Sequence, residues 1–164
     1  MKKAKLIIWT VAAGFKLLQM LKPQSWFTKK EERNYNDVKQ VIVMRTKYPD
    51  GNGGTMKLRT GKLIAQGSHA SMAFLVKKAS TNQSLSDEEH FWIYDSFKKI
   101  CLYVETENEL LDLYQKAKDA KLTVELITDS GKTEFHGIPT NTCLAIGPHE
   151  SNLIDPLTKN LPLL

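Results

Sequence analysis

Four short apolar runs alternate with longer segments of helical pattern, and this alternation limits the fold more than any other feature of the chain. The runs cover residues 39–46 (KQVIVMRT), 98–105 (KKICLYVE), 122–128 (LTVELIT) and 142–148 (TCLAIGP). Such runs, bounded by turn residues, predict buried strands. Strands that alternate with helices predict an α/β fold, here a three-layer sandwich with helices flanking a mixed, mostly parallel four-stranded sheet. An antiparallel pairing of the last two strands is the open alternative.

Capping residues mark where the intervening helices begin. Ser86 and Glu89 have the spacing of a capping box, and so do Thr106 and Glu109, so a helix is expected after each pair. Thr60 precedes the segment 61–79 as an N-cap residue, and that segment is expected to be helical. Its core-facing side is expected to comprise Leu63, Ile64, Phe74 and Leu75.

The first 38 residues differ from the rest of the chain. Residues 1–22 combine a basic start with an apolar run, and they predict an N-terminal hydrophobic helix. Two uses of this helix stay open, a membrane anchor or interfacial helix and a helix packed on a protein partner. Residues 23–38 have mixed charges and no hydrophobic period, which predicts a linker. The folded domain is therefore expected to span residues 39–164.

Positive charge is concentrated at two places. Residues 1–40 hold nine Lys/Arg against three Asp/Glu, a net charge of +6, whereas residues 41–164 hold fourteen against fifteen, a net charge of −1. Within the second part, a basic stretch between positions 45 and 62 includes Lys47, Lys57 and Arg59. This stretch is either a solvated loop or a rim that binds phosphate groups.

Motifs for covalent, nucleotide-dependent and metal-dependent chemistry do not occur in the sequence. There is no G-x-S-x-G elbow, no dinucleotide fingerprint and no Walker sequence. The four histidines lack metal-ligand spacing, so we expect no metal and no other cofactor. Cys101 and Cys143 lie inside apolar runs, and we expect both to be buried in a protein of a reducing compartment, the cytoplasm.

Lys62 falls in the first turn of the expected 61–79 helix, where a cation opposes the helix dipole at a cost of up to about 1 kcal/mol. Gln66 and His69 follow on the same helix face. Asp129 directly follows the run 122–128, and the carboxyl ends of parallel strands meet at one sheet edge, so Lys62 and Asp129 are expected to share a cleft. The alternatives are that Asp129 only caps a turn and that His69 is an ordinary half-buried histidine.

Two longer patterns contain these residues. G-K-x-x-A-Q-x-x-H-A is met by Gly61, Lys62, Ala65, Gln66, His69 and Ala70. D-x-G-x-T…T-C-x-x-I-G-P is met by Asp129, Gly131, Thr133, Thr142, Cys143, Ile146, Gly147 and Pro148. Together they resemble the type-two (archaeal and eukaryotic-type) peptidyl-tRNA hydrolases, over residues 39–164. The chain departs from the family pattern in a longer loop 47–60 and in the tail 1–38, and neither departure removes a site residue.

The resemblance implies hydrolysis of the ester between tRNA and a peptide or N-blocked aminoacyl group, without a metal. By motif matching, Lys62 stabilises negative charge and Asp129 orients or activates water. Gln66, Thr133 and Thr142 hold the ester and the water by hydrogen bonds. His69, together with the basic-loop residues Lys47, Lys57 and Arg59, is expected to contact the tRNA.

Other functions and partners remain open at this point. A non-catalytic RNA-binding protein, or a membrane-tethered adaptor acting through residues 1–38, is the alternative to an enzyme. The expected partners are peptidyl-tRNA, a membrane surface for residues 1–22 and a second copy of the chain in a homodimer.

Overall fold

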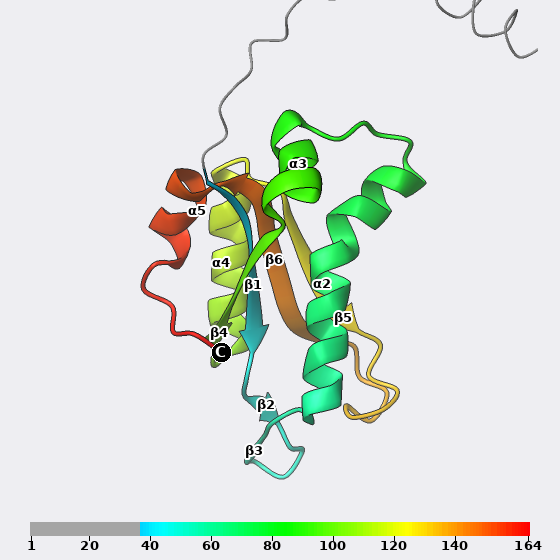
Figure 1. Cartoon of the computed structure of the whole chain (residues 1–164). Coiled ribbons are helices and arrows are strands. Elements are labelled where there is room, and N and C mark those ends of the chain that lie inside the picture. The colour runs from blue at the N-terminus through cyan, green and yellow to red at the C-terminus, as the bar shows by residue number, and fades with distance from the viewer. Residues whose placement is uncertain (1–36) are drawn as a thin grey trace, which may run out of the picture. The chain divides into compact units, whose positions relative to one another are not determined.

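The structure, a computed structural model, describes residues 37–164 (Figure 1). The expected helix 1–22 and nearly all of the expected linker 23–38 lie outside the described residues. Four strands form one sheet in the order β4-β1-β6-β5. Their bounds are β1 Val38–Arg45, β4 Lys98–Val104, β5 Val124–Asp129 and β6 Thr140–Glu150.

The sheet is mixed as expected, but the prediction that it is mostly parallel is wrong. β1 pairs in parallel with β4, whereas the β1–β6 and β5–β6 pairings are antiparallel. The reason is the connection between β5 and β6, which is a loop over residues 130–139 and not a helix, so the chain returns directly as an antiparallel neighbour. The antiparallel alternative for the last two strands is confirmed.

Helices cover both faces of the sheet and give three layers (Figure 1). Their bounds are α2 Thr60–Ser80, α3 Asp87–Phe91, the π-helix η2 Trp92–Ser96, α4 Glu107–Asp119 and α5 Ser151–Thr158. The capping boxes at Ser86 and Thr106 are both confirmed, with reciprocal hydrogen bonds to the glutamate three residues on. The expected N-cap of α2 is wrong by one residue, because Thr60 already belongs to the helix and Arg59 caps it without a side-chain bond.

Strand β1 is the centre of the hydrophobic core. Val41 and Val43 pack into the cluster formed with α4 and α5, whereas Ile42 and Met44 pack into the cluster under α2. All eight residues of β1 are buried. The centre of a strand covered on both faces has no polar side, which explains the unbroken apolar run at residues 41–44.

Leu63, Phe74 and Leu75 of α2 pack in the core as expected, but Ile64 does not. Ile64 is 65% exposed, whereas Gln66 is 2% exposed and lies in the core beside Ala70 and Phe74. Hydrogen bonds satisfy both ends of the Gln66 amide, so burial of this polar group carries little penalty. Cys143 is buried as expected, but Cys101 is exposed, because α2 packs on β1, β6 and β5 and the edge strand β4 lies beyond it.

The basic loop contains a small hairpin of its own. β2 (Tyr48–Pro49) pairs antiparallel with β3 (Thr55–Met56). Tyr48 and Leu58 pack with Phe135, which ties the hairpin to the loop that joins β5 and β6. Between residues 37 and 164, no helix combines the length and the apolar composition that a membrane crossing requires.

Candidate active site

Lys62 and Asp129 form an ion pair at one end of the sheet. The Lys62 Nζ lies 2.5 Å from the Asp129 Oδ2, and their side chains are 15% and 11% exposed. Lys62 is in the first turn of α2, and Asp129 is the last residue of β5. β1 and β5 run in the same direction because each is antiparallel to β6, so the loop after β1 and the end of β5 meet at one sheet edge, as expected.

Three donors converge on the Asp129 carboxylate. Oδ2 accepts hydrogen bonds from Lys62 Nζ and from Gln66 Nε2 at 2.9 Å, and Oδ1 accepts one from the Gly131 N–H at 2.9 Å. Burial raises the pKa of Asp129, but the bonds from Lys62 and Gly131 outweigh it, so the net pKa lies below the ordinary value. The carboxylate is therefore ionised at neutral pH. Asp129 also closes the turn at Gly131, so the turn-capping alternative is true alongside the ion pair.

Glycine is the one residue type that the turn at position 131 admits. Its φ is +80°, and a Cβ at this position would lie 2.2 Å from the carbonyl oxygen of Ile138. The close approach lets the Gly131 carbonyl accept hydrogen bonds from the backbone of Phe135 and Gly137. The sequence pattern contains Gly131, but its role as a backbone donor to Asp129 emerges only from the fold.

Thr142 orients the Gln66 side chain from the buried side of the cluster. Its hydroxyl donates to Gln66 Oε1 at 2.6 Å, and Thr142 is fully buried on β6. This bond orients the amide so that Nε2 points to Asp129. The neighbouring Cys143 thiol donates to the Gln66 carbonyl oxygen at 3.3 Å. Burial raises the pKa of Cys143 to about 12, so no thiolate nucleophile forms here at neutral pH.

The hydrogen bonds link all five residues expected to be catalytic. The chain of contacts runs from Thr142 through Gln66 and Asp129 to Lys62, and Lys62 Nζ also donates to Thr133 Oγ1 at 3.2 Å. Thr142 and Gln66 lie at the buried end, and Thr133 lies at the exposed end. The structure brings these residues together, and their individual roles remain proposals.

Unused hydrogen-bonding capacity remains at the surface of this cluster. The Lys62 ammonium has three N–H donors, and within residues 37–164 two of them are taken, by Asp129 and Thr133. The Asp129 carboxylate has about four acceptor positions, and three of these are taken. One donor and one acceptor are thus left side by side for a ligand.

Two clefts open on the cluster. One, of about 440 Å³, is lined by Gln66, His69 and Asp129 together with residues 126–128 and 130. The other, of about 470 Å³, is lined by Lys62, Thr133 and Arg59 among others. His69 is exposed at the first cleft, so its side chain is available for a ligand.

The three basic-loop residues are not equivalent. Arg59 lines the same cleft as Lys62 and pairs with Glu134 at 3.0 Å. Lys47 pairs with Glu105 at 2.5 Å, away from the cluster. Lys57 is exposed and has no ion pair with any residue from 37 to 164. Two of the three cations expected to meet phosphate therefore already have a carboxylate partner.

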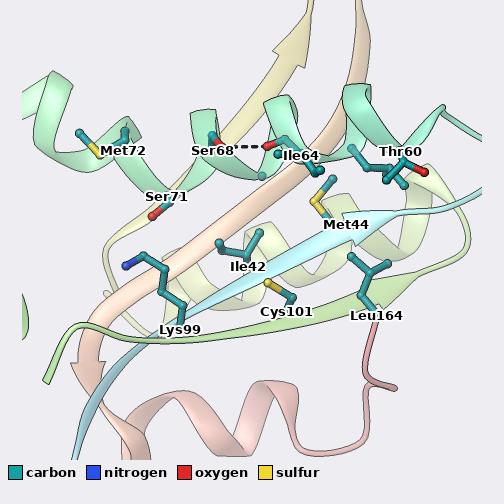
Figure 2. Close-up of a pocket in the computed structure, with 12 residues that line it drawn as sticks. Ile42, Met44, Thr60, Ile64, Ser68, Ser71, Met72, Lys99, Cys101 and Leu164 are labelled. Atoms are coloured by element: carbon teal, nitrogen blue, oxygen red, sulfur yellow. Dashed lines mark hydrogen bonds between the residues drawn. The ribbon is translucent and has the colours of Figure 1, made fainter.

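A separate hollow of about 510 Å³ lies on the other side of α2 (Figure 2). Figure 2 shows α2 residues such as Ile64 and Met72 facing β1 and β4 across it, with Leu164 at one end. Its lining is apolar except for small hydroxyls and one charged side chain, Lys99. It contains no carboxylate, no histidine and no ion pair, so the polar cluster is the candidate active site.

Comparison with known proteins agrees with this geometry. The family model described as "Peptidyl-tRNA hydrolase PTH2" matches residues 38–164. This chain belongs to the PTH2 family of peptidyl-tRNA hydrolases. The match begins at the first residue of β1 and includes every residue of the polar cluster.

Curated archaeal relatives cover the same part of the chain. A peptidyl-tRNA hydrolase of Nanoarchaeum equitans is 38% identical over 126 residues, which is 77% of this chain and 98% of the relative. A peptidyl-tRNA hydrolase of Methanopyrus kandleri is 37% identical over 126 residues, 77% of this chain and 97% of the relative. The enzyme of Methanocaldococcus jannaschii is 34% identical over 127 residues, 77% of this chain and the whole of the relative.

Proposed function

We propose that this chain hydrolyses the ester that joins a peptide, or an N-blocked aminoacyl group, to tRNA, and that Lys62 and Asp129 carry the reaction. The observation that supports this most is the unused Lys62 donor beside the unused Asp129 acceptor. A donor at this place stabilises negative charge on an ester oxygen, and an acceptor beside it orients water for attack. The cation that the reaction requires is supplied by Lys62, so no metal is needed.

The proposed reaction is a direct attack by water. The water oxygen forms a bond to the ester carbonyl carbon, and the carbonyl electrons move to its oxygen, which Lys62 Nζ holds by a charge-assisted hydrogen bond. The tetrahedral intermediate then collapses and breaks the bond to the ribose oxygen. The water proton leaves by way of Asp129 and ends on the ribose oxygen. The products are a peptide acid and a tRNA with a free terminal hydroxyl.

Asp129 acts mainly by orientation. Its pKa lies below the ordinary carboxyl value, so at neutral pH it is a weak base. Three fixed hydrogen bonds leave one direction on Oδ1 for a water molecule. Gln66 and Thr142 hold the carboxylate in place from the core, and Thr133 fixes the Lys62 ammonium from the exposed side.

The proposed tRNA contacts lie around the cluster. His69 lines the cleft beside Asp129, which suits a contact to the terminal nucleotide. Arg59 reaches the same cluster, and it would give up its ion pair with Glu134 to bind a phosphate. Lys57 is exposed and can bind a phosphate without breaking an ion pair between described residues. Lys47 would have to leave Glu105, so we assign it the weakest contact.

A non-catalytic protein on the same fold is the alternative, and the geometry gives it no support. An RNA-binding protein has no need for a buried Thr142–Gln66 pair that orients a carboxylate toward a lysine. All five polar residues are kept together in hydrogen-bond contact.

The test is release of peptide from N-acetyl-aminoacyl-tRNA by the full chain. We expect the wild-type chain and a Lys159→Gln control, altered at an exposed lysine after α5, to release it at equal rates. Lys62→Met should be at least about 100-fold slower. Chelator treatment should leave hydrolysis intact on a substrate shortened to the 3′ end, whose structure does not depend on magnesium. A folded wild-type chain without hydrolysis would reject the proposed function.

We also propose that the enzyme works in the cytoplasm, where its tRNA substrate is found, and that residues 1–22 attach it to a membrane surface or to a protein partner. Fractionation of the full chain and of a chain lacking residues 1–38 distinguishes these two uses from no attachment at all. A homodimer stays a prediction, and light scattering on the full chain measures it.

A further inference from the structure

Four lysines gather at the end of the sheet opposite the candidate active site. Lys77 and Lys78 come from the last turn of α2, Lys118 from the last turn of α4, and Lys121 from the turn that follows α4. They line a groove of about 400 Å³ together with the first residues of β5. We call this the lysine groove. The two lysines of α2 and the two at the end of α4 are separated by 40 positions in the sequence, so only the fold brings the two pairs together.

The lysine groove keeps an excess of positive charge. Lys77 pairs with Glu125 at 2.7 Å and Lys78 with Glu89 at 2.5 Å. Lys118 and Lys121 have no carboxylate partner among residues 37–164, and Lys118 lies over the Tyr114 ring at 5.3 Å.

The rest of the domain does not share this excess. Residues 37–164 contain fifteen Lys/Arg and sixteen Asp/Glu, a net charge of −1. The lysine groove, counted with Glu89 and Glu125, is +2. It is therefore a local feature that needs its own explanation.

The lysine groove and the active site lie on the same side of the domain. Lys62 and Lys77 are fifteen positions apart on α2 and within about 60° of each other around the helix, so both face β5 at a separation of about 22 Å along the axis. β5 runs from the groove at Val124 to the active site at Asp129, about 17 Å. His69 and its cleft lie between the two.

We propose that the lysine groove binds backbone phosphates of the tRNA about six nucleotides away from the ester. This inference rests on the proposed function. Stacked nucleotides advance about 3.4 Å along one strand, so a strand with its 3′ end at Lys62 reaches the groove after about 22 Å. The path follows α2 and the edge of β5, with His69 at its middle. The contact differs from the basic loop 47–60, where carboxylates neutralise two of the three cations.

The chemistry of the groove favours a phosphate backbone over an acidic protein segment. Seven of its eleven lining residues are lysines or other polar residues, and the rest are Phe74, Tyr114, Leu122 and Val124. Phe74 and Val124 are buried in the core, so little apolar surface is left for an anchor side chain of a protein partner. Point charges on flexible stems suit phosphates, which are repeated and need no shape selection. The distance from Lys62 then sets which phosphates are met.

The test compares two charge-matched double variants of the full chain. Lys118→Gln with Lys121→Asn removes the two unpaired groove charges, and asparagine suits the positive φ of 57° at position 121. Lys116→Gln with Lys159→Gln removes two charges elsewhere, since Lys116 pairs with Asp112 on another side of α4. Each double variant is assayed on full-length N-acetyl-aminoacyl-tRNA and on the three-nucleotide 3′ end of that substrate. This short substrate is about 10 Å long and cannot reach the groove.

For the groove variant we expect a rise in KM of about 10- to 60-fold on the full-length substrate at 0.1 M salt, with kcat unchanged. Through counterion release, one phosphate contact changes the binding constant about eightfold between 0.1 and 1 M salt. Loss of two contacts should therefore reduce the slope of log binding constant against log salt concentration by about 1.8. The short substrate should be cleaved equally by both variants and by the wild type. Binding of deacylated tRNA, measured by fluorescence anisotropy, should weaken by the same factor, and this readout needs no hydrolysis.

Equal effects of the two double variants on full-length tRNA would overturn the lysine groove as an RNA contact. So would an equal loss on the long and the short substrate, because it would mean a disturbed active site. If the wild-type chain binds tRNA through the groove but hydrolyses neither substrate, the proposed function fails while the groove contact stands.

Discussion

Replacing Lys62 by methionine removes the cation of the Lys62–Asp129 pair and keeps an unbranched side chain of similar length. The pair is mostly buried, with exposures of 15% and 11%, so it lies between a surface pair, worth up to about 1 kcal/mol, and a fully buried one, whose disruption costs about 3–5 kcal/mol. Asp129 keeps its bonds from Gln66 and Gly131, which lowers the cost of leaving it unpaired. Relief of the helix-dipole penalty recovers a further few tenths of a kcal/mol.

We therefore expect Lys62→Met to lower the free energy of unfolding by about 2 kcal/mol, or the melting temperature by about 6–10 °C. Turnover should fall at least about 100-fold, the scale of losing one preorganised donor to an oxyanion. Lys62→Arg keeps the charge but changes its shape and reach, so it should restore stability and only part of the turnover.

A double variant separates the structural role of Lys62 from its catalytic role. Lys62→Met combined with Asp129→Asn leaves no uncompensated charge, so its unfolding free energy should return to within about 1 kcal/mol of wild type. Its turnover should stay at the level of the single Lys62→Met variant. Thermal unfolding and single-turnover hydrolysis are measured on the same preparations. If Lys62→Met alone lost stability but kept its turnover within about 10-fold of wild type, Lys62 would only hold Asp129 in place, and its proposed role in stabilising the oxyanion would be refuted.

Three further outcomes follow from the same geometry. Because the pKa of Asp129 lies below its ordinary 3.8, kcat/KM should stay level from pH 8 to about 5 and fall only below about pH 4. The stability that the ionised carboxylate contributes should be lost over that same acid range. An acid limb centred above pH 5 in the pH–rate profile would contradict this. Lys57→Ala should reduce the salt slope of tRNA binding by about 0.9, and Lys47→Ala should reduce it less because Lys47 is ion-paired; equal slopes in a titration would place the RNA elsewhere. Gly131→Ala should destabilise the fold by more than about 2 kcal/mol, seen as early thermal unfolding, since its Cβ would meet the Ile138 carbonyl at 2.2 Å.

The residues that sequence reasoning placed best are those whose signal is local. The capping boxes at Ser86 and Thr106 need only four consecutive residues, and both form as expected. The centre of β1, residues 41–44, is buried on both faces of the sheet and therefore shows in the sequence as an unbroken apolar run. Lys62 was marked by a local conflict, a cation in the first turn of a helix, and the fold supplies its partner in Asp129.

The misplaced features depend on contacts between distant parts of the chain. The direction of β6 follows from a loop connection and from its insertion between β1 and β5, which no periodicity records. The buried face of α2 contains Gln66 because Thr142, 76 positions away, satisfies its amide. Cys101 is exposed because its strand lies at the sheet edge.

The sequence by itself determined where the strands and capped helices lie and which polar residues make up the candidate active site, because backbone preferences and motif spacing act over a few residues. Only the tertiary structure decided which of those polar groups are paired. It neutralised two of the cations of the basic loop, left one donor on Lys62 and one acceptor on Asp129, and gathered the lysine groove from separate helices. Charge pairing and burial depend on distances of a few ångströms between segments far apart in the chain, and those distances exist only once the sheet has formed.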